Sequence, residues 1–326
     1  IVGLALLTPG LLGLGAYVVA KQTVAMALDR KAPEIMKKSL SAVSGMEKDV
    51  PLTEEVERYA ELLSEKPLRT VSIKAFDGET LVGHYLPCEN ARRTVVAFHG
   101  WRSSWNRDFG AGSLFWTEQK CNILFVEQRG QNQSAGDYMG FGLLERYDCL
   151  SWVRWLQNSG ETLPVYVAGI SMGAATVLMA SELLPESFVK GIMADCGYTS
   201  PNAIWKHVLK KNLRLPYTGL QAKIAAELCK RKLNGADCRF SAADALRRSK
   251  IPVLFIHGAD DHFVPVEMTY ENYLACTAPK ELLIVPGADH GMSYYREPEK
   301  YRRAVLRFFA ENDGKTKGQS SAAYTD

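Results

Sequence analysis

The most informative segment of this 326-residue chain reads Val165-Tyr166-Val167-Ala168-Gly169-Ile170-Ser171-Met172-Gly173. Its first part is apolar and β-branched, as in a strand buried on both faces, and apolar residues at helical spacing follow it. Between the two stands a G-x-S-x-G pattern, whose glycines leave room for a sharp reversal of the chain. The segment therefore predicts a strand, a tight turn and a helix, with Ser171 exposed at the turn as a candidate nucleophile.

Similar apolar runs recur along the chain and alternate with amphipathic helical stretches. The predicted strands are a hairpin of 71–76 and 81–86, then 94–98, 122–126, 165–170, 189–194, 251–256 and 282–285. The main predicted helices are 143–157, 172–184 and 299–311. This alternation predicts an α/β fold, with a mostly parallel sheet covered by helices on both faces. An insertion of about 45 residues breaks the rhythm, and it predicts a small helical lid at about 197–240.

The loop after the predicted strand 94–98 reads His99-Gly100-Trp101. A site for acyl transfer needs two N–H donors that stabilise the oxyanion of the reaction. We expect these donors to be the backbone N–H groups of Met172, at the start of the helix after Ser171, and of Trp101. His99 itself is expected to hydrogen-bond within its loop.

Two more strand ends carry titratable residues. Asp260 and Asp261 follow the predicted strand 251–256, and a carboxylate there can orient a histidine and stabilise its imidazolium form. The spacing Asp-x-x-Val-Pro favours Asp261 over Asp260. His290 follows the last predicted strand, where it can act as general base and then as general acid. Ser171, Asp261 and His290 therefore form a candidate catalytic triad.

The chain from about Val71 to Ala310 resembles bacterial α/β-hydrolases of the serine-aminopeptidase-like and dienelactone-hydrolase-like kind, many of which carry an N-terminal membrane anchor. The matching segments are 98–100, 127–130, 141–142, 145–148, 169–173, 195–198, 261–265 and 290–291. This resemblance implies the α/β-hydrolase fold, a hydrolase activity, and Ser171, Asp261 and His290 as the triad.

The chain departs from that family in one loop. The family often reads Asp-x-Arg-x-His-Gly-x-Ser after the second core strand, whereas here Glu127 replaces the aspartate and Gln131-Asn132 replace the His-Gly pair. Because this loop is structural in most members, we expect an altered rim of the site and no loss of activity.

Aromatic residues gather near the predicted site and indicate an apolar substrate pocket, although core packing is an alternative for each of them. We expect Trp105, Tyr198, Trp205 and Tyr294 to bind substrate. The favoured function is hydrolysis of a hydrophobic carboxylic ester. A thioesterase, a lipase or an aminopeptidase using the same triad remains an alternative, as does a catalytically silent binding module on this fold.

Composition limits the range of partners. The net charge of +3 gives no reason to expect a nucleic-acid partner. The sequence has neither a phosphate-binding loop nor a dinucleotide fingerprint, and none of its seven cysteines forms a C-x-x-C pair. We therefore expect a small ester or acyl substrate, and neither a metal nor an organic cofactor.

The N-terminal residues 1–20 carry no charge and have about the length that spans a bilayer as a helix. We expect a membrane anchor, with a cleavable signal peptide and hence secretion, or a helix packed on the domain, as alternatives. Residues 21–66 are expected to form a helical extension, 67–312 the hydrolase domain, and 313–326 a disordered tail. Neither the side of the membrane nor the oligomeric state follows from the sequence.

Overall fold

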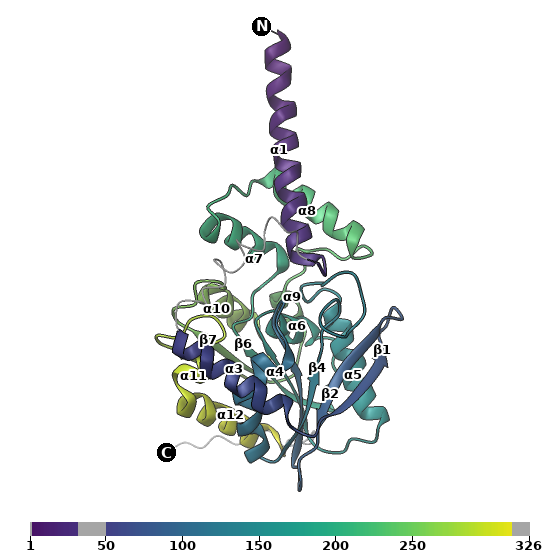
Figure 1. Cartoon of the computed structure of the whole chain (residues 1–326), viewed down its shortest axis with the longest axis vertical. Helices are drawn as coiled ribbons and strands as arrows, with labels where there is room; N and C mark the ends of the chain where they lie inside the picture. The colour runs from purple at the N-terminus through teal and green to yellow at the C-terminus, as the bar shows by residue number, and fades with distance from the viewer. Residues whose placement is uncertain (1, 32–49, 315–326) are drawn as a thin grey trace.

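A single eight-stranded sheet organises the molecule (Figure 1). The computed structural model describes residues 2–31 and 50–314. The strands run in the spatial order β1-β2-β4-β3-β5-β6-β7-β8, in which β1 and β2 are antiparallel to their neighbours and the others are parallel. They are β1 (Arg69–Lys74), β2 (Thr80–Leu86), β3 (Arg93–Phe98), β4 (Cys121–Val126), β5 (Val165–Ile170), β6 (Val189–Asp195), β7 (Val253–Gly258) and β8 (Lys280–Val285).

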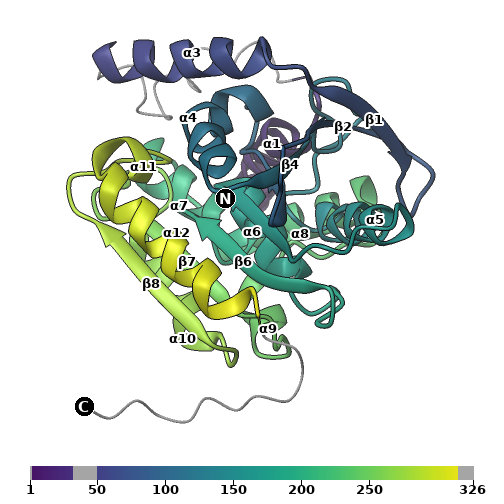
Figure 2. The same ribbon diagram turned by 90° about the horizontal axis from the view of Figure 1, so that it is seen from below.

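Helices cover both faces of this sheet, as the sequence predicts (Figure 2). The helices are α1 (Val2–Leu28), α3 (Val50–Ser64), α4 (Trp105–Glu118), α5 (Glu145–Asn158), α6 (Met172–Ala180), α7 (Pro201–His207), α8 (Gly219–Lys232), α9 (Ala242–Leu246), α10 (Val266–Ala275), α11 (Ser293–Arg296) and α12 (Pro298–Asn312). Helices α5 and α6 pack on one face, and α4 and α12 pack on the other, with α3 lying outside α4.

The central strands are buried on both faces because successive side chains of a strand point to opposite sides. In β3, Val96 and Phe98 belong to the hydrophobic core under α6, whereas Val95 and Ala97 belong to the core under α4 and α12. All four side chains are fully buried. The sheet is therefore a rigid support, and its carboxyl-terminal edge presents the loops after β3, β5, β7 and β8 together.

Several element boundaries differ from those predicted. Strand β7 begins at Val253 because Pro252 has no N–H to donate to the sheet. Within the predicted helical lid, α7 ends at His207, and the π-helical turn η2 (Val208–Asn212) continues it. Helix α6 ends at Ala180, four residues before the predicted end.

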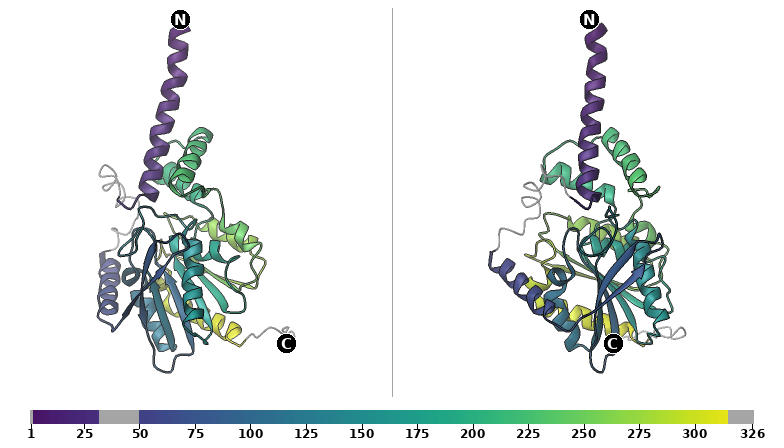
Figure 3. Two further views of the ribbon diagram at one scale, coloured as in Figure 1. Left: turned by 90° about the vertical axis from the view of Figure 1, so that its right-hand side faces the viewer. Right: turned by 45° about the vertical axis from the view of Figure 1, so that its right-hand side comes forward.

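The inserted helices α7 and α8 lie beyond the carboxyl-terminal edge of the sheet, next to the C-terminal half of α1 (Figures 1 and 3). Helix α1 packs on α8, and its Ala20, Val24 and Leu28 are completely buried. Lys232 of α8 forms an ion pair of 2.6 Å with Asp29, just after α1. The last part of α1 is therefore an integral part of the folded domain.

Both ends of the chain bear on the predicted domain boundaries. Within the ranges that the structure describes, no helix combines the length and the hydropathy required to cross a membrane. The membrane anchor predicted for residues 1–20 stays a prediction. At the other end, Asp313 forms an ion pair with Arg93 and accepts a hydrogen bond from Tyr166, so the ordered domain extends one residue past 312. The tail at 315–326 lies outside the described residues.

Candidate active site

Ser171 stands in the sharp turn between β5 and α6. Its backbone has φ 56° and ψ −115°, a conformation that a residue other than glycine adopts only under strain. The flanking glycines make the turn possible, because a Cβ on Gly173 would lie 1.8 Å from the carbonyl oxygen of Phe98. A Cβ on Gly169 would lie 2.2 Å from the backbone of Gly173. The G-x-S-x-G pattern is thus a steric requirement of the strand–helix crossing.

The three residues predicted as a triad meet at this turn. His290 Nε2 lies 2.8 Å from Ser171 Oγ, and His290 Nδ1 lies 2.7 Å from Asp261 Oδ2. The loops after β5, β7 and β8 supply one residue each, because the carboxyl ends of parallel strands lie at the same edge of the sheet. The side chains form a connected hydrogen-bonded chain from a hydroxyl to an imidazole to a carboxylate.

The carboxylate of Asp261 is held from several sides. Its Oδ1 accepts hydrogen bonds from the backbone N–H groups of Phe263 (2.9 Å) and Val264 (2.8 Å). The neighbouring Asp260 is used differently, since its Oδ2 accepts the N–H of Gly287 at 2.7 Å. The structure therefore separates two adjacent carboxylates, placing Asp261 against the histidine and Asp260 in the loop scaffold.

His257 is a second imidazole on Asp261, which the sequence analysis did not single out. Its Nε2 lies 3.1 Å from Asp261 Oδ2 and 2.9 Å from the carbonyl oxygen of Val264, and its Nδ1 lies 2.6 Å from the hydroxyl of Thr269. Two acceptors at Nε2 place the ring proton there, so the Thr269 hydroxyl donates to Nδ1. His257 is completely buried and helps to fix the carboxylate.

Electrostatics favour a charged pair between Asp261 and His290. Burial by itself raises the pKa of Asp261, but His290 and His257 outweigh it and lower that pKa. Burial by itself lowers the pKa of His290, but the carboxylate of Asp261 outweighs it and raises that pKa well above its usual value. The carboxylate thus stabilises the imidazolium that forms when the histidine takes up a proton.

Cys196, at the end of β6, brings a thiol close to the same histidine. Ligand atoms of Cys196, Asp261 and His290 all lie within 4.8 Å of one another. These are residue types that bind metal ions, but here Asp261 and His290 bond to each other, and His290 also bonds to Ser171. Burial raises the pKa of the Cys196 thiol to about 11, so the thiol stays protonated at neutral pH.

The two predicted oxyanion donors come from different segments of the chain. Met172 is the first residue of α6, where backbone N–H groups have no partner within the helix. Trp101 belongs to the loop after β3, which Asp108 of α4 holds in place. Asp108 accepts the N–H of Gly100 at 2.6 Å and the hydroxyl of Ser103 at 2.5 Å. Sequence reasoning missed Asp108, although an acidic residue in the first turn of a helix is a recognisable signal.

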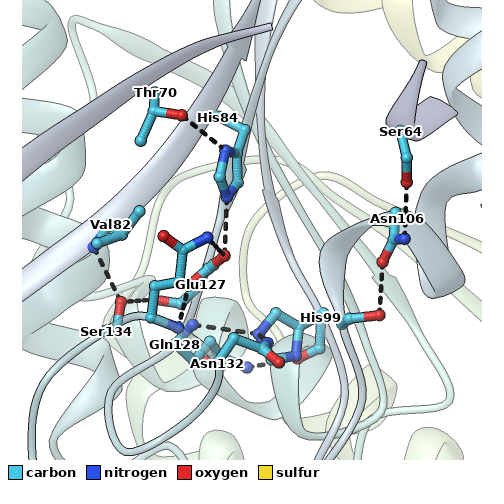
Figure 4. Close-up of polar contacts among 12 residues, drawn as sticks. Ser64, Thr70, Val82, His84, His99, Asn106, Glu127, Gln128, Asn132 and Ser134 are labelled. Atoms are coloured by element: carbon cyan, nitrogen blue, oxygen red, sulfur yellow. Dashed lines mark hydrogen bonds and ion pairs between the residues drawn. The ribbon is translucent and has the colours of Figure 1, made fainter. Parts of the chain in front are cut away.

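A buried polar network supports this loop from below (Figure 4). His99 Nε2 accepts the backbone N–H of Gln128 at 3.2 Å, which leaves the proton on Nδ1 to bond the carbonyl oxygen of Gly100 at 2.8 Å. Burial lowers the pKa of His99, in agreement with a neutral ring. His99 therefore hydrogen-bonds within its loop, as the sequence predicts.

The residues that depart from the family pattern are part of the same support. Glu127 pairs with the buried His84 at 2.7 Å (Figure 4). Asn132 Nδ2 donates to the carbonyl oxygen of Ser103 at 3.2 Å. Gln131 Oε1 accepts the backbone N–H of Arg102 at 2.6 Å. Gln131 and Asn132 thus brace the loop that carries Trp101, whereas Glu127 holds His84 of β2.

An open cavity of about 760 Å³ surrounds Ser171 and His290. The loop of Gly100 and Trp101, the start of α4 and Val56 of α3 form its walls, together with Phe263 and Tyr295. Arg107 and Asp108 place charges at its rim. The cavity gives a substrate access to the serine, and its walls are mostly apolar.

The four aromatic residues predicted to bind substrate do not line this cavity. Trp105 stacks on His84 and Phe125 in the core under α4, because it begins α4 on the side that faces the sheet. Tyr198 packs against Phe141 in the core. Trp205 of α7 lines a separate cavity beside the first.

Tyr294 is displaced for a different reason. It turns toward α12, where its hydroxyl accepts hydrogen bonds from Arg302. Its neighbour Tyr295 lines the catalytic cavity in its place, because one residue along a helical turn rotates a side chain by about 100°.

Known proteins with similar sequences or folds include hydrolases. The protein YqkD of Bacillus subtilis is 27% identical over 232 residues, which cover 71% of this chain and 75% of YqkD. The esterase Pf2001 of Pyrococcus furiosus superimposes with a TM-score of 0.63 at 22% identity, covering 78% of this chain and 94% of the esterase. Est1E of Butyrivibrio proteoclasticus, solved with ferulic acid bound, gives a TM-score of 0.57 at 18% identity, covering 75% of this chain and all of Est1E.

The structural likenesses establish the α/β-hydrolase fold that the sheet order and the nucleophile turn already indicate. The sequence profile of the prolyl oligopeptidase family matches residues 140–316, a segment that includes Ser171, Asp261 and His290 and exceeds half of the chain. With its fold and its hydrogen-bonded serine, histidine and aspartate, this chain belongs to the prolyl oligopeptidase family of hydrolases.

Proposed function

We propose that the protein hydrolyses carboxylic esters of hydrophobic acids through an acyl-enzyme formed on Ser171. One observation carries the proposal: the bonds of 2.8 Å and 2.7 Å that link Ser171, His290 and Asp261 at the floor of an accessible cavity. A serine hydroxyl is a weak nucleophile unless an adjacent base takes its proton, and a base works best when a third group orients it.

The proposed reaction has two steps. Ser171 Oγ attacks the carbonyl carbon of the ester while His290 Nε2 takes the hydroxyl proton, and that proton then passes to the departing alcohol. The N–H groups of Trp101 and Met172 stabilise the negative oxygen of the tetrahedral intermediate. A water molecule, activated by His290, then attacks the acyl-enzyme and releases the acid.

The expected outcome is that the purified protein cleaves p-nitrophenyl acetate and is labelled by a fluorophosphonate probe, and that Ser171→Ala abolishes both. The loss in kcat is expected to be about 10⁴-fold or more, because the substitution removes the nucleophile itself. Ser187→Ala, which changes an exposed serine outside the lining of the cavity, is the matched control and should keep both properties.

Two results would count against the proposal. Full labelling of the Ser171→Ala variant would remove Ser171 from the chemistry. Absence of labelling in the wild-type protein would instead favour a silent binding module on the same fold. Either result is read directly from a gel, without knowledge of the physiological substrate.

Amide hydrolysis is a second candidate, because the profile that matches the chain describes oligopeptidases. A serine aminopeptidase would need a free carboxylate in the cavity to bind the amino group of the substrate. Asp108 lies in the wall, but its two oxygens already accept hydrogen bonds from Gly100 and Ser103. A panel of p-nitrophenyl esters, acyl-CoA thioesters, triglycerides and aminoacyl p-nitroanilides separates these activities, and we expect the highest kcat/KM on the esters.

A further inference from the structure

A second cavity, of about 490 Å³, lies between the end of α1 and the lid. Thr23, Met26 and Ala27 of α1 form one wall, and Ile204 and Trp205 of α7 contribute to the opposite wall. No charged side chain among the described residues lines it. Its single hydroxyl-bearing side chain, Thr23, donates its proton to the carbonyl oxygen of Val19 at 2.8 Å, so that proton is not offered to a ligand. The walls are therefore suited to a hydrocarbon.

This cavity adjoins the catalytic one through two shared residues, Trp101 and Phe263, which line both. Trp101 belongs to the oxyanion loop, and the ring of Phe263 stands edge-on to His290 with centroids 5.0 Å apart. A substrate carbonyl at Ser171 thus has an apolar space directly beyond these two rings.

The last turn of α1 is bonded to the oxyanion loop itself. The indole of Trp101 donates to the carbonyl oxygen of Ala27 at 3.0 Å, and the guanidinium of Arg102 donates to that of Met26 at 3.0 Å. Carbonyl groups in the last turn of a helix have no partner within the helix, so these bonds satisfy them. The wall of the apolar cavity and the loop that holds the oxyanion are consequently one structural unit.

We infer that the cavity between α1 and the lid binds the acyl chain of the substrate, and that the enzyme acts on esters of medium-chain fatty acids. The walls of this cavity are apolar, and they continue from the catalytic cavity through Trp101 and Phe263, as the chain of an acyl group held at Ser171 requires. Each buried methylene of the chain strengthens binding, since it leaves water for an apolar wall. This inference rests on the ester hydrolysis proposed above and adds the class of acyl group to it.

The test compares p-nitrophenyl octanoate with p-nitrophenyl acetate, through the ratio of their kcat/KM values. Met26→Trp places an indole in the cavity from α1, and we expect it to lower this ratio by about tenfold or more. Val18→Trp adds the same side chain at an exposed position of the same helix and should leave the ratio within about twofold of wild type. Trp205→Ala enlarges the cavity and should shift the preference from octanoate toward dodecanoate.

Thermal unfolding of each variant shows whether it folds. If Met26→Trp does not fold, the chain-length preference of Trp205→Ala tests the inference independently. The inference is overturned if the wild-type enzyme prefers acetate, or if Met26→Trp lowers both kcat/KM values equally. Failure of the proposed function has a different signature, namely acetate hydrolysis that persists in Ser171→Ala or is absent from the wild-type protein.

Discussion

At His290 two opposing influences set the affinity for a proton. Burial disfavours the charged imidazolium, but the adjacent carboxylate of Asp261 outweighs burial and raises the pKa well above its usual value of about 6.5. A general base must be unprotonated to accept the proton of Ser171. Because the pKa of His290 is raised, the enzyme is expected to become active only as the pH rises above the usual pKa of a histidine.

We expect kcat/KM for an ester to rise with pH and to reach half its maximum above pH 6.5. In Asp261→Asn the raising charge is gone and burial remains, so the inflection should move below 6.5, while kcat falls by about 10⁴-fold. Asp260→Asn is the matched control, because that carboxylate accepts the N–H of Gly287 instead. A pH–rate profile of the three proteins checks this, and an inflection that is unchanged in Asp261→Asn would contradict it.

The positions of single residues also explain why the triad could be predicted from the sequence, whereas the residues that line the pocket could not. Ser171, Asp261 and His290 follow strands of a parallel sheet, so the topology alone brings their loops to one edge. Trp105 and Tyr294 depend instead on how a short helix is rotated, and a rotation of one residue turns a side chain from the cavity into the core. The local sequence pattern therefore shows which residues follow the strands, but it says little about how a short helix is rotated.

Among the elements, α3 is held in place by a close helix crossing. Gly110 of α4 lies against the backbone of α3, since a Cβ there would stand 2.6 Å from the carbonyl carbon of Tyr59. Helix α3 also contributes Val56 to the wall of the catalytic cavity. A single glycine therefore sets the distance at which one wall of the site is docked.

Gly110→Ala is expected to push α3 away and to lower the free energy of unfolding by about 1–3 kcal/mol. Gly112→Ala changes the same helix two residues on, where a Cβ meets nothing within 4 Å, and should raise stability by about 0.5–1 kcal/mol. Urea denaturation of the two variants beside wild type measures both signs. If both substitutions changed the free energy of unfolding equally, the prediction would be wrong, because α3 and α4 could then move apart without loss of stability.

For the molecule as a whole, a buried ionic cluster joins three separate segments. Arg129, after β4, makes a two-pronged pair with Asp148 of α5 at 2.6 and 2.5 Å. It also bonds Asp77, in the turn between β1 and β2, at 2.7 Å. Burial raises the pKa of Asp148 to about 7 even with this cation beside it. The cluster therefore ties the antiparallel edge of the sheet to a helix on its face.

The sequence indicated this cluster only indirectly, through the matching segments 127–130 and 145–148. Those segments are 19 residues apart from Arg129 to Asp148, and no local pattern states that the two charges pair. Helix α1 is a comparable case, because its packing on α8 joins residues some 200 positions apart, as Asp29 and Lys232 show. Contacts at such separations follow from the completed fold, whereas strands and turns follow from neighbouring residues.

Arg129→Leu tests the cluster, because it leaves Asp148 buried without its cation. We expect the free energy of unfolding to fall by about 3–5 kcal/mol at pH 8. An aspartate whose pKa is higher in the folded state than its unfolded value of about 3.9 opposes folding increasingly as the pH rises between the two. The loss should therefore be smaller at pH 5, where Asp148 of the variant is protonated. Asp77→Asn removes a partly exposed partner of Arg129 and should lower the free energy of unfolding by about 1 kcal/mol or less. If the loss of stability in Arg129→Leu did not depend on pH, packing and not charge would hold these segments together.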